Sequence, residues 1–260
     1  MNTLNRKKVG LALGSGGAKG LAHVGVLQAL EENNVPIDLI CGSSMGAVVG
    51  ALYATGTSLS MFKELIPQLG MHEMVDYTIS KLGIVRGNKS KELIKKLTDT
   101  KRFEETTIPF SCIAADLLNG YKKVFNTGYI YDGVRASMSI PGIFVPYELN
   151  GRIYVDGGMI ERTPVNTARE MGADIVIACD LNYRGQEIDP PKNTLSTLNH
   201  VLAFMSWEIA RHEIYNADVL LLPDVLNVNP YTTKDTQATI ELGYQATMDS
   251  MDKILEAVAL

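Results

Sequence analysis

The sequence predicts an α/β fold in three layers, α/β/α, around a central and mostly parallel sheet. Two short segments, 9–13 and 175–179, are almost wholly apolar, which is typical of parallel strands covered on both faces. A third apolar segment, 38–41, lies between helical patterns at 21–32 and 45–54. Strands that alternate with helices in this way indicate a parallel sheet with helices packed against it.

The composition indicates a single globular domain over residues 1–260, with a more polar, helical insert at about 57–105. The hydrophobic fraction is 46% and the charged fraction 20%, which is ordinary for a globular protein. Because the net charge is −5 and dense basic runs are absent, nucleic acid is not an expected partner. Cys41, Cys112 and Cys179 lie in apolar segments, which predicts buried free thiols in a reducing, cytoplasmic compartment.

Residues 42–46 have the Gly-x-Ser-x-Gly pattern of a nucleophile elbow. Ser44 falls between a strand and a helix, and Gly42 and Gly46 leave room for backbone to approach closely. The Ser44 hydroxyl is then expected to point out of the sheet, beside the positive end of the helix dipole. An ordinary strand-to-helix turn is the alternative, because a pattern this short also arises by chance.

A glycine-rich loop at 14–20 links the first strand to the first helix and has three interpretations. A dinucleotide fingerprint needs glycine where Lys19 stands. A phosphate-binding P-loop needs Ser or Thr after the lysine, but Gly20 follows it. An oxyanion hole needs only accessible backbone amides, and this interpretation fits best beside a serine elbow. The amides predicted to form the hole belong to Gly16, Gly17 and Ala18.

A carboxylate stands at the end of another apolar segment, 152–155. The Asn150-Gly151 pair predicts a hairpin turn before this segment, so Asp156 is expected at the edge of the sheet. Gly157 and Gly158 follow Asp156 and allow another backbone to come close. The alternative interpretation is an ordinary Asp-Gly turn.

The other elements follow from periodicity and turn residues. The segment 71–87 has no clear period, and we expect either a lid over an acyl pocket or an irregular packed connection. The uncharged stretch 39–62 has the length of a membrane span, but it contains the elbow and many Gly, Ser and Thr residues. The further predictions are strands at 110–116, 121–125, 145–149 and 219–222, and helices at 57–69, 91–97, 130–138, 164–171, 195–215 and 235–258.

Taken together, three motifs resemble the bacterial patatin-like phospholipases, or acylesterases. They are the loop at 15–20, the elbow at 42–46 and Asp156 with its two glycines. The run 136–146 also resembles the family's segment before its aspartate, and the similarity covers most of residues 7–180. One departure is Ser15, which stands where the family's loop usually has the first of three glycines.

The resemblance implies a patatin-like fold and a hydrolase of lipid acyl esters, phospholipid or lysophospholipid. It also implies a Ser–Asp dyad, Ser44 and Asp156, with no catalytic histidine, cofactor or metal. The expected partners are the lipid or ester substrate and a membrane surface contacted peripherally.

The histidines give independent support for Asp156 as the base. A serine hydroxyl needs a neighbouring base to become a nucleophile. His200 and His212 follow in the order that a triad needs, but both fall in a helical pattern, where we expect exposed or half-buried side chains. His23 is expected to support the glycine loop without transferring a proton. An aspartate normally has a pKa of about 3.9, and burial would raise it toward that of an effective base.

Two cations have alternative roles. Lys19 is predicted either to lend its charge to a lipid phosphate or to the loop itself, or to be solvated. Arg135 is predicted either to support substrate or loop or to form an ion pair with a carboxylate.

Two other function classes stay open at this stage. An acyltransferase or thioesterase can use the same elbow but normally needs a histidine near Ser44. A non-catalytic module would hold a nucleotide or acyl-phosphate on the glycine loop.

Overall fold

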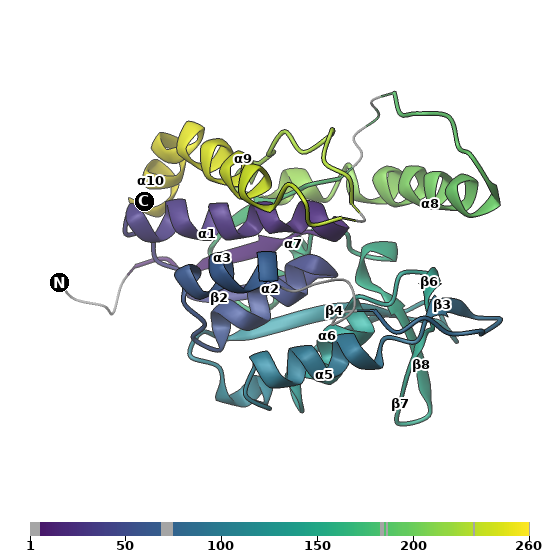
Figure 1. Ribbon diagram of the computed structural model, residues 1–260. Coiled ribbons are helices and arrows are strands. Elements are labelled where there is room, and N and C mark those ends of the chain that lie inside the picture. The colour runs from purple at the N-terminus through teal and green to yellow at the C-terminus, as the bar shows by residue number, and fades with distance from the viewer. Residues whose placement is uncertain (1–5, 69–74, 183–184, 186, 231, 260) are drawn as a thin grey trace.

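The structure, a computed structural model, describes residues 6–68, 75–182, 185, 187–230 and 232–259. Its centre is an eight-stranded sheet in the order β10-β9-β1-β2-β4-β8-β7, with β5 paired to β4 (Figure 1). The strands from β10 to β4 are parallel, and β5, β7 and β8 are antiparallel to their neighbours. The strands are β1 (Val9–Leu13), β2 (Leu39–Ser43), β4 (Phe110–Asp116), β5 (Lys122–Phe125), β7 (Tyr147–Leu149), β8 (Arg152–Asp156), β9 (Ile175–Cys179) and β10 (Val219–Leu221).

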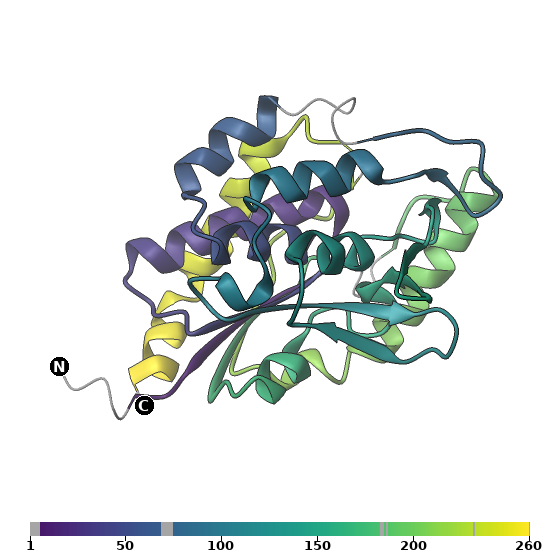
Figure 2. The same ribbon diagram turned by 90° about the horizontal axis from the view of Figure 1, so that it is seen from below.

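Both faces of the sheet are covered by helices (Figure 2). Along β1, Leu11 and Leu13 join the larger apolar cluster, beneath α1 and α2, whereas Ala12 joins a smaller cluster with Val165 and Ala168 of α7. This alternation is the pleat of a strand buried on both sides, and it confirms the predicted three-layer α/β/α fold. The helices are α1 (Ala22–Glu32), α2 (Met45–Ala54), α3 (Leu59–Gln68), α5 (Asn88–Leu97), α6 (Ile130–Ser137), α7 (Val165–Glu170), α8 (Thr194–Ala210), α9 (Thr236–Asp249) and α10 (Met251–Ala259).

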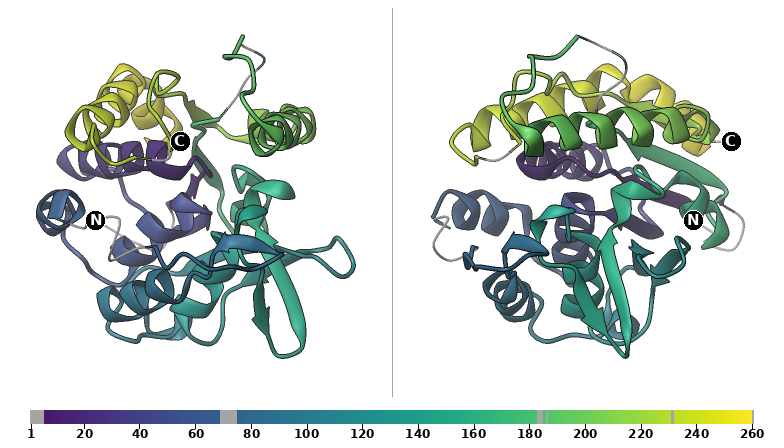
Figure 3. Two further views of the ribbon diagram at one scale, coloured as in Figure 1. Left: turned by 45° about the vertical axis from the view of Figure 1, so that its right-hand side comes forward. Right: turned by 90° about the vertical axis from the view of Figure 1, so that its right-hand side faces the viewer.

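Two helical predictions are partly wrong. The helix predicted at 235–258 is broken at Ser250 into α9 and α10, because the second part turns to bury Met251 and Ile254. The helix predicted to reach Tyr215 ends at Ala210, and a short 3-10 turn follows at Ile214–Asn216. The helix α8 lies beside the body of the molecule and not in either covering layer (Figure 3).

Residues 57–105 contain α3 and α5, close to the two helices predicted there, and also a strand that the sequence did not indicate. The strand β3 (Gly83–Val85) pairs in parallel with β6 (Gly142–Phe144) in a separate two-stranded sheet. Part of the segment 71–87 lies outside the described residues, including Met71 and Met74. In the described part, Leu82 and Ile84 are exposed, so these side chains are not packed as in a buried connection.

Candidate active site

The elbow forms at the junction of β2 and α2. Ser44 follows directly after β2 and has φ 53° and ψ −119°, a conformation that a non-glycine residue rarely adopts. A Cβ on Gly46 would lie 2.1 Å from the carbonyl oxygen of Leu13, and a Cβ on Gly42 would lie 2.5 Å from the Cα of Ala47. Both positions therefore need glycine, because strand and helix backbones meet there.

The structure brings Ser44 and Asp156 together although 112 positions separate them in the sequence. Asp156 ends β8, which pairs antiparallel with β4, and β4 pairs in turn with β2. The Ser44 hydroxyl donates to Oδ2 of Asp156 at 2.6 Å. The other carboxylate oxygen, Oδ1, accepts a hydrogen bond from the Gly158 amide at 2.7 Å. The Gly158 amide thus fixes Oδ1 of the carboxylate, and Oδ2 faces the Ser44 hydroxyl.

Burial makes Asp156 a stronger base than an aspartate in water. Ser44 is 4% exposed and Asp156 3% exposed. Loss of solvent raises the pKa of Asp156 to about 6, although hydrogen bonds from Ser44 and Gly158 and the charge of Arg162 act in the opposite direction. At neutral pH the carboxylate is mostly ionised and has a higher proton affinity than an exposed one, as a general base requires.

The C-terminal end of α6 holds both predicted catalytic residues by their backbones. The Ser44 amide donates to Oγ of Ser137 at 2.9 Å, and the Asp156 amide donates to the carbonyl of Ser139 at 3.0 Å. Neither serine was predicted to have a role. The available signal was their position in the run 136–146, which resembles the family's segment before its aspartate.

The glycine loop is held from several sides and leaves two amides available. The Gly14 amide donates to Cys179, and the Ser15 amide to Arg162. The amide of Ala18 donates to the carbonyl of Pro230 at 2.8 Å, so one of the three amides predicted for the oxyanion hole is already engaged. Among the described residues, the amides of Gly16 and Gly17 have no such acceptor.

His23 supports the glycine loop through a hydrogen bond to its backbone. It is fully buried, and its Nε2 lies 2.8 Å from the carbonyl oxygen of Gly14. Burial lowers the pKa of His23 to about 4, against the hydrogen bond to Gly14 and the charge of Asp180. The imidazole is therefore neutral near pH 7, and it donates Nε2–H because a carbonyl only accepts.

Residues 11–169 match the family described as patatin-like phospholipase. The chain belongs to this family. The match contains the loop, the elbow and Asp156, which are the three parts of the site described above.

Individual relatives agree with this assignment. An NTE family protein of Mycobacterium tuberculosis is 38% identical over 188 residues, which cover 72% of this chain and 52% of that protein. Lysophospholipase NTE1 of Pyricularia oryzae is 29% identical over 95% of this chain but only 16% of its own length. Patatin-like phospholipase domain-containing protein 6 of Mus musculus is 34% identical over 70% of this chain and 14% of its own. The chain thus spans about half the length of its mycobacterial relative and a smaller share of the others.

Solved structures share the fold. VipD from Legionella pneumophila superposes with a TM-score of 0.66 at 16% identity, over 95% of this chain and 67% of VipD. The type III effector protein ExoU gives a TM-score of 0.53 at 17% identity, over 96% of this chain and 54% of ExoU. The patatin-like arrangement of sheet and helices is therefore retained with little sequence identity.

Arg135 of this patatin-like chain is buried, but it forms no ion pair within the described residues. Its guanidinium donates to Oγ of Ser139 at 2.5 Å and to three carbonyl oxygens. Burial lowers the pKa of Arg135 to about 10, partly offset by Tyr147 and Asp76, so the side chain stays charged at neutral pH. It therefore supports the segment that holds Asp156. The three carbonyls belong to Arg86, Gly87 and Val145.

The remaining predicted residues have less direct positions. Lys19 lies partly buried in the 3-10 turn Gly17–Leu21, and its contact with substrate stays a prediction. His200 is partly buried in α8 and His212 is exposed after it, as predicted, whereas His72 lies outside the described residues. The three cysteines are buried and free, also as predicted.

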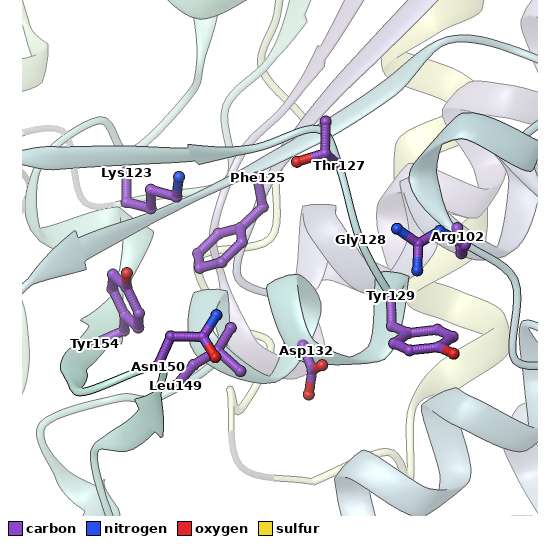
Figure 4. A pocket seen from close by; sticks show the side chains of 10 residues that line it. All are labelled: Arg102, Lys123, Phe125, Thr127, Gly128, Tyr129, Asp132, Leu149, Asn150 and Tyr154. Carbon is purple, nitrogen blue, oxygen red and sulfur yellow. The ribbon is translucent and has the colours of Figure 1, made fainter.

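A cavity of about 440 Å³ lies beside α6, β5 and the β7–β8 hairpin (Figure 4). Neither Ser44 nor Asp156 lines it, although Tyr154 does and lies two residues before Asp156 on β8. The cavity is therefore separate from the predicted catalytic pair. Its lining residues are Arg102, Lys123, Phe125, Thr127, Gly128, Tyr129, Asp132, Leu149, Asn150 and Tyr154.

Proposed function

We propose that this chain hydrolyses acyl esters of lipids, phospholipid or lysophospholipid, with Ser44 as nucleophile and Asp156 as base. The observation that carries the proposal is the 2.6 Å hydrogen bond from the Ser44 hydroxyl to Asp156, buried at a strained strand-to-helix corner. The family supports the substrate class, and a relative described as a lysophospholipase supports the ester bond.

The first half of the reaction forms an acyl-enzyme. Oγ of Ser44 attacks the ester carbonyl while its proton passes to Oδ2 of Asp156. The carbonyl oxygen becomes an oxyanion, which accepts hydrogen bonds from the amides of Gly16 and Gly17. The tetrahedral intermediate then collapses, the alkoxide leaves, and Asp156 returns the proton to it. The serine stays acylated, and the carboxylate is again ionised.

The second half releases the fatty acid. Water attacks the acyl-enzyme and gives a proton to Asp156, and the same two amides stabilise the second oxyanion. Collapse of this intermediate expels Ser44, which recovers its proton from Asp156. One carboxylate is thus base and acid in each half, as microscopic reversibility requires, and no histidine enters the cycle.

The proposal is tested on a panel of phospholipids, lysophospholipids and soluble esters. Ser44→Ala removes the nucleophile and Asp156→Asn removes the base, so each should lower kcat by about 10³ or more. Ser111→Ala is the matched control, because Ser111 is also a buried serine but lies on β4 beside two sulfur atoms. Hydrolysis by Ser44→Ala at the rate of the control would overturn the proposal.

A further inference from the structure

We propose that three segments at the carboxyl end of the sheet form a docking surface for an anionic lipid bilayer. They are residues 77–84, the turn 117–121 and the outer face of α8, and together we call them the rim. The inference rests on the proposed function in one respect, because a bilayer is where lipid esters are found. Its own support is the position, exposure and charge of the rim.

The first segment is held by backbone hydrogen bonds and leaves large apolar side chains in solvent. The Thr78 amide donates to the carbonyl of Ile84, and β3 is paired with β6. Tyr77 is 76% exposed, Leu82 is 65% exposed and Ile79 is fully exposed. Single exposed apolar residues are ordinary, but a group of this size on one short segment marks an interaction surface.

The second segment is the turn between β4 and β5. Leu117, Leu118 and Tyr121 are all more than half exposed. The turn is fixed by the Leu118 amide, which donates to Oδ1 of Asp116. Since β4 pairs with both β2 and β8, this turn follows the strand that joins the two halves of the candidate active site.

The third segment is the outer face of α8. Leu198, Val201, Met205 and Ile209 follow one another at intervals of three and four residues, and all are exposed. They therefore share one face of the helix. The opposite side is the packed one, because Ser206 and Ala210 are buried there. A helix of a globular protein normally shows polar residues to solvent, whereas an apolar outer face is typical of helices that lie in a membrane interface.

The three segments lie at the same end of the molecule as the catalytic elements. Figures 1 and 2 show them on the right-hand side, the side toward which the arrow of β4 points. The right panel of Figure 3 looks directly at this end. Ser44 and the glycine loop follow the carboxyl ends of β2 and β1, and such ends of parallel strands face the same edge of a sheet.

Charge favours an anionic bilayer over a second copy of this chain as the occupant. Residues 75–91, which include the first segment of the rim, contain four basic side chains and one acidic one, whereas the whole chain has a net charge of −5. Of these basic residues Lys81 lies within the rim itself, and Lys91 is paired with Asp132 at 2.9 Å. Lys81 is exposed and stands between Ile79 and Leu82. Basic residues beside apolar ones are attracted to anionic headgroups. Within the described ranges, helices with the length and apolarity of a membrane span are absent.

The test is co-sedimentation of the purified chain with vesicles of phosphatidylcholine alone or mixed with phosphatidylglycerol. The double variant Ile79→Ser with Leu82→Ser should lower the partition coefficient onto the vesicles about tenfold or more. The single variant Met205→Ser should also lower this coefficient. Lys81→Gln should lower it about fivefold on the anionic vesicles only. Leu255→Ser is the matched control, because Leu255 is 45% exposed on α10 at the opposite end of the molecule, and it should partition as the wild type does.

Two further measurements separate docking from catalysis. All rim variants should hydrolyse a soluble short-chain ester at the wild-type rate but lose activity on vesicles. Ser44→Ala should bind vesicles normally and hydrolyse neither substrate, so a failure of the proposed reaction leaves the docking result intact. The rim proposal is overturned if wild type binds neither vesicle, if rim variants partition as the Leu255 control does, or if they change only self-association in sedimentation velocity.

Discussion

Replacing Asp156 with Asn should change the pH dependence of stability in a direction that the burial of its carboxylate determines. The pKa of Asp156 is about 6 in the folded chain, against about 3.9 in an unfolded one. Between these values the folded state binds a proton that the unfolded state lacks, so stability falls as pH rises through the window. The gap of about two pH units corresponds to about 3 kcal/mol. The Asp156→Asn variant has no carboxyl group at this position, so its stability should not fall with pH in this way.

Urea unfolding of both proteins between about pH 4 and pH 8 measures this difference, since all other titrations cancel in the comparison. The stability of Asp156→Asn relative to wild type should rise by about 3 kcal/mol across that range. Asp38→Asn is the control without such a rise: burial alone would raise the pKa of Asp38, but the hydrogen bonds from Arg6 and Val9 lower it. The contribution of Asp38 to stability is therefore lost only below about pH 4, and the difference between this variant and wild type should stay nearly flat over the range measured. A difference for Asp156→Asn that is flat, or that falls with pH, would refute the argument that its carboxylate is desolvated.

Three other changes test individual parts of the site. Ser137→Ala leaves the Ser44 amide without its acceptor, so it should lower the free energy of unfolding in urea by about 1–3 kcal/mol and also lower kcat. Ser206 is a buried serine that is hydrogen-bonded within its own helix, and the control Ser206→Ala should keep kcat. Equal kcat values for the two variants would contradict the role assigned to Ser137. Gly17→Ala places a Cβ 2.6 Å from the Pro230 carbonyl oxygen at φ +56°, so kcat should fall by about 10², whereas an unchanged kcat would remove Gly17 from the oxyanion hole. The kcat/KM for a soluble ester should rise with pH through about 6 as Asp156 ionises, and a profile flat from about pH 5 to pH 7 would argue against this base.

The parts of the fold that the sequence predicted well are those in which local pattern and packing agree. The strands at 9–13 and 175–179 are apolar on both faces because both faces are covered. The elbow was recognisable because its geometry needs glycine at positions 42 and 46. A Cβ at either position would clash with neighbouring backbone atoms. Asp156 was recognisable from the glycines after it, and the sheet order then brings it to Ser44.

What the sequence did not reveal depends on contacts between distant segments. Pro230 lies far from the glycine loop in sequence, so its hydrogen bond with Ala18 had no local signal. The apolar spacing from Ile240 to Leu255 continues through Ser250, although the helix breaks there and leaves Leu255 exposed. Periodicity shows which residues share a helical face, but it does not show whether that face meets the core or solvent, as α8 illustrates.

The most direct test of the account is labelling with a fluorophosphonate, followed by peptide mapping and intact mass. Such a reagent phosphonylates a serine oxygen, with loss of fluoride, when a neighbouring base activates that serine. We expect a single adduct on Ser44 in the wild type, formed far more slowly in Asp156→Asn and at the normal rate in His200→Ala. An adduct on another residue, or full reactivity of Ser44 after the loss of Asp156, would contradict it.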